Sequence, residues 1–210
     1  PILATISELY SVNRYSSLPE REKVEVEHSL EDHLNEHIRR INRFDSIKIT
    51  EFGTRRRFSR LWQHHVVGEL KNKIGNKLAG TSNVQIASDQ NIPCGGTMAH
   101  ELFMIKSAID INENGVKLKD SMKSILDLWK EMYPESLRIV LPDTYRTKPF
   151  VETVLDQEEF THSWRGFRHD SGDPDEFMDI LFTRYGREVI KNKTTIFSDA
   201  LDMTQIENLY

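Results

Sequence analysis

One seven-residue stretch places a guanidinium, a carboxylate and the start of a helix close together. It reads Arg-His-Asp-Ser-Gly-Asp-Pro at residues 168–174. A guanidinium pairs well with phosphate or carboxylate oxygens, and the free N–H groups of a helix N-terminus also attract anions. Asp173 before Pro174 is typical of an N-cap followed by proline at the first helical position. The stretch therefore suits a phosphorylated or sugar-like substrate.

Short apolar segments and amphipathic helices alternate on both sides of this stretch. The aromatic segment 164–167 precedes it as a strand, and Phe177, Ile180 and Leu181 follow it at helical spacing. Five other strands are expected at 47–52, 78–80, 90–94, 137–141 and 194–197, of which 90–94 is the weakest. Helices are expected to include 58–70, 102–105 and 118–129. This alternation indicates an α/β fold with a parallel sheet, either an eight-fold barrel or an open doubly wound sheet.

Both architectures bind ligands at the carboxyl ends of their strands. In this chain those ends carry glycine, hydroxyl or charged residues, as at 81–83, 143–144 and 198–199. Any one such turn is more often a simple loop. Their repetition at the end of strand after strand favours one shared site.

Composition limits the class of partner. The formal charge is −5, from 28 basic and 33 acidic residues, which disfavours nucleic acid as the main partner. No apolar run is long enough to cross a bilayer, so no membrane association is expected. The single cysteine, Cys94, cannot form an internal disulfide and fits a reducing cytoplasm.

The pattern also suggests how the chain is divided. A long charged helix at 19–43 precedes the repeats, so a helical lead-in is expected at 1–44 and β/α repeats over 45–210. The chain begins without methionine, and residues 203–210 look like a helix that has only begun. We therefore expect an excerpt of a longer protein.

Five strings occur in one order along the chain. They are EFGTRRRFS at 51–59, GTSN at 80–83, GTMAHE at 96–101, RHDSGDP at 168–174 and FSDALD at 197–202. In order and spacing they resemble nicotinate phosphoribosyltransferases, over essentially the whole chain. Members of that family are considerably longer.

The resemblance implies a reaction and a fold. The reaction is transfer of a phosphoribosyl group from phosphoribosyl pyrophosphate to nicotinate, which yields nicotinate mononucleotide and pyrophosphate for NAD biosynthesis and is coupled to ATP hydrolysis. The fold is an irregular, TIM-like α/β barrel. Mg²⁺ held mainly by pyrophosphate oxygens and water would fit this chemistry, and a homodimer is expected.

The resemblance also implies how the nicotinate ring is bound. Phe52 is expected to stack on one face of the pyridine ring and Arg168 to cover the other. Arg55 resembles a residue that meets ribose or pyrophosphate oxygens. At least one of the three arginines at 55–57 is expected to point outward or into a structural ion pair, because consecutive side chains cannot share one direction.

Ser82 is the residue expected to select nicotinate, the acid, over nicotinamide, the amide. In the similar nicotinamide phosphoribosyltransferases an aspartate at this point suits the amide NH2, whereas serine can donate its hydroxyl to a carboxylate. Thr97 resembles a second hydroxyl and backbone contact to nicotinate. Thr81 and Ser198 complete the substrate-binding set.

His100 has the position of the histidine that ATP phosphorylates in the family. It is expected in the first turn of a helix, with Thr97 as a possible N-cap, and a helix N-terminus favours the neutral, nucleophilic ring. Asp170 and Asp199 are expected to hold the ribose hydroxyls and to stabilise positive charge on the ribose. Asp143 is a substrate-side carboxylate that could, like Asp199, act as an outer partner of Mg²⁺.

Three other interpretations remain open at this point. The chain could prefer nicotinamide, which Ser82 argues against. It could be a phosphoribosyl-binding barrel without catalysis. Nucleic-acid binding through the arginines at 55–57 and Arg60 is disfavoured by the acidic balance.

Overall fold

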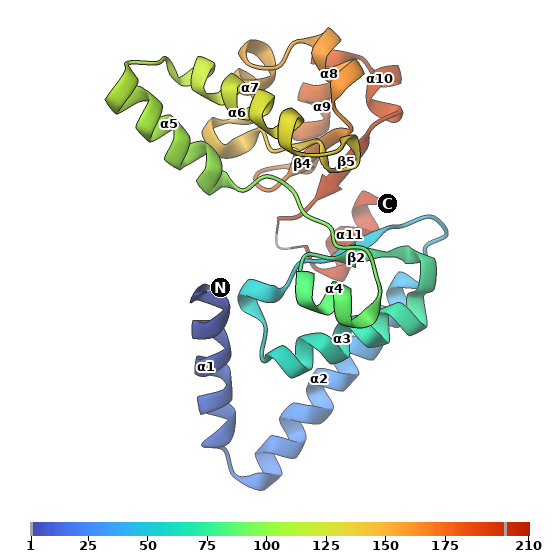
Figure 1. Cartoon of the computed structure of the whole chain (residues 1–210). Coiled ribbons are helices and arrows are strands. Elements are labelled where there is room, and N and C mark those ends of the chain that lie inside the picture. Colours follow the sequence, from blue (N-terminus) through green and yellow to red (C-terminus); the bar gives the residue numbers. More distant parts are fainter. Residues whose placement is uncertain (1, 200) are drawn as a thin grey trace. The chain divides into compact units, whose positions relative to one another are not determined.

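The computed structural model describes residues 2–199 and 201–210 (Figure 1). The fold is mixed α/β and mainly helical, with short parallel strands. By its contacts the chain divides into two compact units, Pro1–Gly96 with Asp202–Tyr210, and Thr97–Leu201. The segment at 1–44, expected as a helical lead-in, shares a core with later segments of the first unit.

The first unit contains two parallel strands and five α-helices among its described residues. In chain order its elements are α1 (Ile2–Ser16), α2 (Glu20–Ile41), β1 (Ile49–Glu51), η1 (Thr54–Arg56), α3 (Arg60–Ile74), η2 (Gly75–Lys77), β2 (Leu78–Thr81), α4 (Val84–Gln90) and α11 (Met203–Leu209). Helix α2 confirms the helix expected at 19–43.

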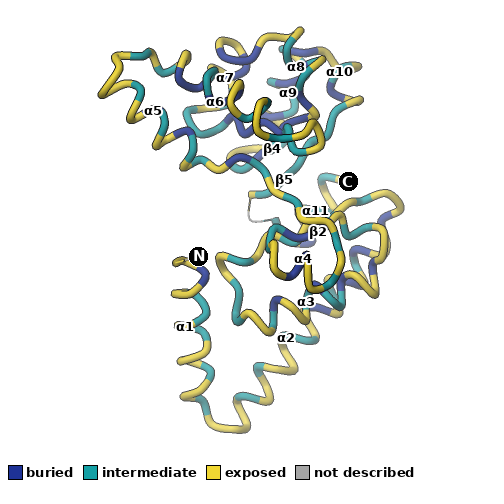
Figure 2. Tube along the Cα trace, in the orientation of Figure 1, coloured by how far each residue is buried: buried dark blue, intermediate teal, exposed yellow. Residues whose placement is uncertain are grey.

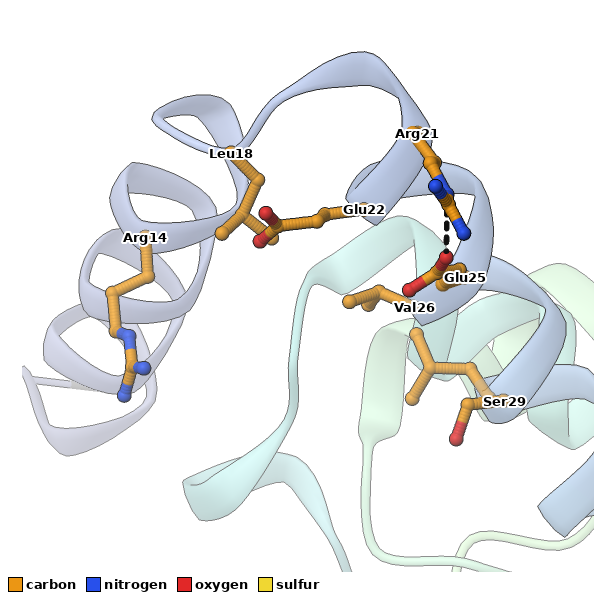
Figure 3. A pocket seen from close by; sticks show the side chains of 8 residues that line it. Arg14, Leu18, Arg21, Glu22, Glu25, Val26 and Ser29 are labelled. Carbon is orange, nitrogen blue, oxygen red and sulfur yellow. Dashed lines mark hydrogen bonds and ion pairs between the residues drawn. The ribbon is translucent and has the colours of Figure 1, made fainter.

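Helix α2 is amphipathic, and its apolar stripe forms the core of this unit. Leu34, Ile38 and Ile41 recur at helical spacing and pack with Leu70 of α3 and Met203 of α11. Helix α1 stays largely exposed (Figure 2). An open groove of about 750 Å³ lies between α1 and α2, where Arg21 is paired with Glu25 (Figure 3). None of the predicted site residues lines this groove, and we assign no ligand to it.

The second unit contains a three-stranded parallel sheet in the order β3-β4-β5. Its elements are α5 (His100–Asn114), α6 (Leu118–Met132), η3 (Glu135–Leu137), β3 (Ile139–Val140), η4 (Asp143–Tyr145), α7 (Thr147–Thr153), α8 (Gln157–Ser163), β4 (Gly166–His169), α9 (Pro174–Tyr185), α10 (Arg187–Lys191) and β5 (Thr194–Phe197). Gly166 is required where β4 meets β5, because a Cβ there would lie 1.8 Å from the Thr194 carbonyl oxygen.

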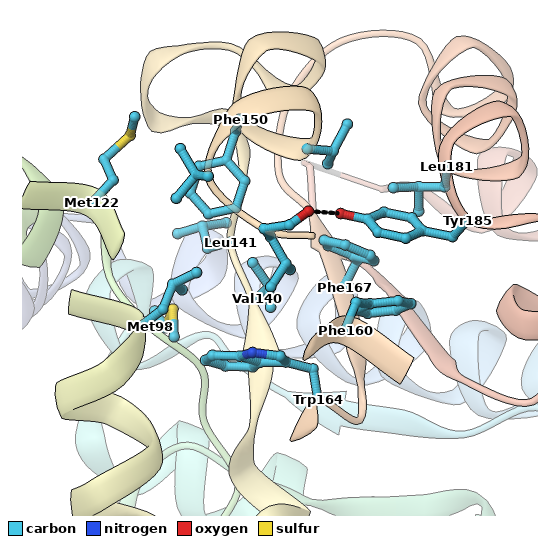
Figure 4. Packing of buried hydrophobic residues seen from close by; sticks show 14 of the residues in the cluster. Met98, Met122, Val140, Leu141, Phe150, Phe160, Trp164, Phe167, Leu181 and Tyr185 are labelled. Atoms are coloured by element: carbon cyan, nitrogen blue, oxygen red, sulfur yellow. Dashed lines mark hydrogen bonds between the residues drawn. The ribbon is translucent and has the colours of Figure 1, made fainter. Parts of the chain in front are cut away.

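Aromatic rings fill the core behind this sheet. Phe160 stacks on Phe167 with ring centroids 4.5 Å apart, and Tyr185 lies 4.5 Å from Phe160 (Figure 4). The Tyr185 hydroxyl donates to the Leu155 carbonyl at 3.0 Å, and burial raises the pKa of this phenol. The sheet that carries the site residues thus rests on a rigid, fully packed layer.

Two fold predictions need correction. A closed TIM-like barrel is not found, because within the described ranges β1 pairs with β2 and β3 to β5 pair among themselves, as two separate sheets. The strand expected at 90–94 was wrong. Asn83 caps a helix by accepting from the Ile86 amide, so residues up to Gln90 are helical, and only one bridge, Thr81 to Cys94, remains.

Other elements agree with the sequence or were missed. The strand expected at 194–197 is confirmed as β5. Strand β4 begins two residues later than the strand expected at 164–167, because Trp164 is the C-cap of α8. Helices α1, α7, α8 and α10 were not predicted. No helix in the described part of the chain is long and apolar enough to cross a membrane.

Candidate active site

Three turns meet at the carboxyl edge of the β3-β4-β5 sheet. Asp143 and Thr144 follow β3, Asp170 follows β4 and Ser198 follows β5. Because parallel strands place their carboxyl ends at the same edge, residues that are far apart in sequence come within hydrogen-bond distance here. The helix α5 brings His100 to the same place.

His100 is the first residue of α5 and is held from both sides of its ring. Nδ1 lies 3.0 Å from Thr144 Oγ1, and Nε2 lies 3.0 Å from Asp170 Oδ2. Asp143 Oδ1 is 3.9 Å from the same Nε2. Ala99, and not Thr97, is the N-cap, and it provides no side-chain hydrogen bond to the helix. The imidazole is therefore oriented by tertiary partners and by its place at the helix start.

Asp170 is the centre of this cluster. Burial raises the pKa of its carboxyl, but hydrogen bonds from Ser198, Arg168 and His100, together with the Arg168 charge, outweigh burial and lower the pKa below its ordinary value. Asp170 is thus an ionised acceptor. In the neutral form of His100 the proton then belongs on Nε2, which leaves the lone pair on Nδ1, where the Thr144 hydroxyl can donate to it.

Arg168 is bound along every edge of its guanidinium. Nε donates to Ser198 Oγ at 2.7 Å, Nη1 to Thr97 Oγ1 at 2.8 Å, and Nη2 pairs with Asp170 Oδ1 at 2.7 Å. Ser198 Oγ in turn lies 2.7 Å from Asp170 Oδ1 and 2.9 Å from the His169 carbonyl oxygen, to one of which it donates. These bonds lie in the guanidinium plane and therefore fix the direction of its flat face.

The remaining carboxylates of this unit differ in their surroundings. The Asp143 side chain is only 6% exposed; Oδ2 accepts from Ser171 at 2.6 Å, whereas Oδ1 is buried without a hydrogen-bond partner in the described chain. Asp199 is exposed. Asp173 caps α9 by accepting from the amides of Asp175 and Glu176 at 2.9 Å, which confirms the predicted N-cap.

The predicted residues of the first unit lie on the turns after β1 and β2. Phe52 is 50% exposed directly after β1, and Arg55 is exposed in η1. Arg57 forms an ion pair with Glu8 at 2.7 Å, which confirms that one of the three arginines is structural. Ser82 follows β2 and is half-buried, and its hydroxyl makes no hydrogen bond within the described residues.

Thr81 has a different environment from Ser82. It is fully buried, and its hydroxyl donates to Glu51 Oε2 at 2.6 Å and accepts from the Asn83 amide at 3.1 Å. Gln63, also buried, donates to both Glu51 oxygens at 3.1 Å. The Thr81 hydroxyl therefore stabilises the turn after β2 from its buried side.

A comparison with protein families identifies this chain. Residues 47–210 match the family described as Nicotinate phosphoribosyltransferase (NAPRTase). The chain belongs to the nicotinate phosphoribosyltransferase family. The match includes every predicted site residue and leaves only the first 46 residues outside it.

Individual relatives agree with this assignment. A curated nicotinate phosphoribosyltransferase of Ralstonia nicotianae is 35% identical over 214 residues, covering 100% of this chain and 51% of the relative. A crystal structure of nicotinate phosphoribosyltransferase from Vibrio cholerae aligns with TM-score 0.80 and 32% identity over 99% of this chain and 48% of that one. A crystal structure of nicotinate phosphoribosyltransferase from Porphyromonas gingivalis aligns with TM-score 0.76 and 32% identity. That alignment covers 100% of this chain and 50% of the other. The chain spans about half the length of these relatives.

The structure adds residues to those expected for a member of the nicotinate phosphoribosyltransferase family. Thr144 contacts His100, and Glu51 and Gln63 join the turns after β1 and β2. Thr144 is the residue after the predicted Asp143, and Glu51 is the first residue of the string EFGTRRRFS, so the sequence could have indicated both as site residues. Gln63 lies within α3 and outside all five strings, so the sequence did not indicate it.

Proposed function

We propose that the protein to which this chain belongs transfers the phosphoribosyl group of phosphoribosyl pyrophosphate to nicotinate, as a glycosyltransferase-type enzyme of NAD biosynthesis. The products are nicotinate mononucleotide and pyrophosphate. The observation that carries the proposal is His100 held between Thr144 and Asp170, beside Arg168, in a chain of this family. A histidine whose ring is oriented by hydrogen-bond partners on both sides is suited to accept a phosphoryl group, so we include coupling to ATP hydrolysis, which would make the enzyme ligase-like.

The proposed coupling step uses His100 as the nucleophile. A ring nitrogen attacks the γ-phosphorus of ATP, the N–P bond forms as the bond to the bridging oxygen breaks, and ADP leaves. Nδ1 is the nitrogen with a lone pair while Nε2–H is held by Asp170, and the Thr144 hydroxyl must turn aside for the attack. Water later takes the phosphoryl group from the phosphohistidine.

In the transfer step, the bond from the anomeric carbon to pyrophosphate breaks as the bond to the nicotinate ring nitrogen forms. Positive charge on the ribose would be stabilised by the ionised Asp170 and by Asp199. Thr97 and Arg168 are proposed to contact nicotinate, and Ser198 is proposed to keep Arg168 in place. The roles of Phe52, Arg55, Thr81 and Ser82 in substrate binding come from the family resemblance.

Mg²⁺ belongs to this proposal because a buried carboxylate oxygen fits it. Asp143 Oδ1 is a hard oxygen ligand without a hydrogen-bond partner in the described chain. No cluster of three or more metal-binding side chains occurs among residues 2–199 and 201–210, so phosphate oxygens and water would complete the coordination. When bound, the cation would neutralise charge on pyrophosphate.

Two measurements on the full-length protein test the proposal. Turnover of nicotinate and of nicotinamide with phosphoribosyl pyrophosphate, with and without ATP, should show the acid as the preferred substrate. Incubation with ATP followed by peptide mass mapping should place one phosphate on His100. Preference for nicotinamide would favour a nicotinamide phosphoribosyltransferase, and no turnover of either compound would favour a non-catalytic phosphoribosyl-binding protein.

Assembly and location are further parts of the proposal. We propose a homodimer, which analytical ultracentrifugation of the full-length protein would test. A reducing cytoplasmic location fits the single, exposed Cys94, whose thiol has no partner cysteine in the sequence.

A further inference from the structure

A closed hydrogen-bond network in the first unit joins the two turns that carry Phe52 and Ser82. Its centre is the side chain of Glu51, the last residue of β1. Oε1 accepts from the Gly53 amide at 2.6 Å, and Oε2 accepts from the Thr81 hydroxyl at 2.6 Å. The Glu51 carbonyl oxygen accepts from the Ser82 amide at 2.9 Å. One residue therefore holds both turns, through its backbone and its side chain.

Gln63 of α3 closes the network from the other side. Its Nε2 donates to both Glu51 oxygens at 3.1 Å and lies 2.8 Å from Thr54 Oγ1, while Oε1 accepts from Asn83 Nδ2 at 3.1 Å. Thr54 belongs to the first turn and Asn83 to the second. Each turn is thus bound to the same buried amide as well as to Glu51.

The donors to the Glu51 carboxylate are neutral in every case. They are a backbone amide, a hydroxyl and a carboxamide, and no Lys, Arg or His pairs with this carboxylate in the described ranges. A Cβ at Gly53 would lie 2.8 Å from Glu51 Oε1, so the carboxylate lies directly over the backbone of the first turn. Such an arrangement restricts backbone position and is poorly suited to proton transfer.

We propose that Glu51 is a positioning residue for substrate selection, which sets the spacing between the Phe52 turn and the Ser82 turn. The inference rests on the proposed function, in which these turns meet the nicotinate ring and its carboxylate. Loss of the link leaves both side chains present but lets the turns move independently. Substrate affinity and the choice of acid over amide then suffer, while the chemistry at His100 does not.

The test compares matched variants of the full-length enzyme. Glu51→Gln keeps the shape of the side chain but offers an NH2 group where an acceptor is needed. Thr81→Val removes only the hydroxyl, and Thr50→Val makes the same change on the exposed face of β1 as a control. The readouts are KM and kcat for nicotinate, the same constants for nicotinamide, and the melting temperature of each variant.

We expect Glu51→Gln and Thr81→Val each to raise KM for nicotinate about tenfold, with kcat within about twofold of wild type, the loss expected for one hydrogen bond to a charged group. The preference for the acid should fall by a similar factor. Because both changes break one link, the double variant should resemble each single variant. Thr50→Val should behave as wild type.

Each other outcome has a definite meaning. Multiplying effects in the double variant would show that Glu51 and Thr81 act independently of each other and would overturn the positioning role of Glu51. Unchanged KM in Glu51→Gln, or a loss of kcat alone, would overturn it too. If Glu51→Gln fails to fold, Thr81→Val still decides through KM. Absence of nicotinate turnover in the wild-type enzyme would overturn the proposed function instead.

Discussion

The two units each place a carboxylate at the end of a parallel strand, but they surround it differently. Glu51 is bound by an amide, a hydroxyl and a carboxamide, all neutral. Asp170 is bound by the guanidinium of Arg168, the imidazole of His100 and the hydroxyl of Ser198. A carboxylate among neutral donors can fix backbone turns, whereas one that faces a cation and a titratable ring can also influence proton and charge transfer.

This difference separates positioning from chemistry. Changes around Asp170 should affect turnover, and changes around Glu51 should affect substrate affinity. Four variants of the second unit test this contrast, from the largest expected effect to the smallest.

Substitution of His100 by alanine should have the largest effect. The variant loses the proposed phosphoryl acceptor, so ATP-dependent phosphate incorporation should vanish and ATP should no longer stimulate nicotinate turnover. Radiolabel from γ-labelled ATP, retained on the protein after gel filtration at neutral pH, measures this. The exposed His162→Ala is the control in the same unit. Full label on His100→Ala would remove this histidine from the mechanism.

Asp170→Asn should come next, because it removes the charge but keeps the shape. We expect kcat to fall about a hundredfold, as for loss of an oriented acid-base partner. The free energy of unfolding should drop by about 2 kcal/mol at pH 7, since hydrogen bonds to charged groups are lost. Exposed Asp179→Asn serves as the control for both readouts.

The pH dependence of this stability loss follows from the lowered pKa of Asp170. A carboxylate with a depressed folded-state pKa stabilises the fold above its ordinary value of 3.8 and loses that contribution as pH falls through the folded value. The difference in unfolding free energy between wild type and Asp170→Asn should therefore be constant near neutrality and shrink below pH 3.8. Urea titrations across this range measure it, and a difference that grows on acidification would contradict the assignment.

Ser198→Ala should have an intermediate effect and is the counterpart of Thr81→Val. Both remove one hydroxyl that touches a strand-end carboxylate. Ser198 is hydrogen-bonded to Asp170, which is proposed to stabilise charge on the ribose, so we expect kcat to fall about tenfold, the value of one charge-assisted hydrogen bond. Arg168 keeps its bonds to Thr97 and Asp170 in this variant, so KM for nicotinate should change little. If Ser198→Ala and Thr81→Val altered the same kinetic constant, the proposed contrast between the units would not hold.

Asp173→Ala should have the smallest effect and should act on stability. Loss of the cap that accepts from two amides of α9 should lower the free energy of unfolding by about 1 kcal/mol. Asp173→Asn should restore most of it, because asparagine is an equally good N-cap. Thermal unfolding of the two variants measures this difference. Equal melting temperatures for Asp173→Ala and the wild type would show that the Asp173 cap does not stabilise α9.

Local patterns predicted much of this fold. The period of the apolar residues predicted α2, α6 and α9, and the Asp-Pro pair predicted where α9 begins. Short helices such as α7 and α8 were missed because seven residues leave too little periodicity to recognise. The barrel was inferred from alternation and resemblance, but alternation does not say which strands pair.

By itself, the sequence determined the family, the local elements and the list of residues able to do chemistry. The family could be recognised because the five strings occur in one order and at characteristic spacings along the chain. Only the tertiary structure decided that His100 lies between Thr144 and Asp170, that Thr97 binds Arg168 and does not cap a helix, and that Glu51 joins two turns. Those pairings depend on strand register and side-chain direction across 30 to 71 residues of chain, which no local spacing specifies.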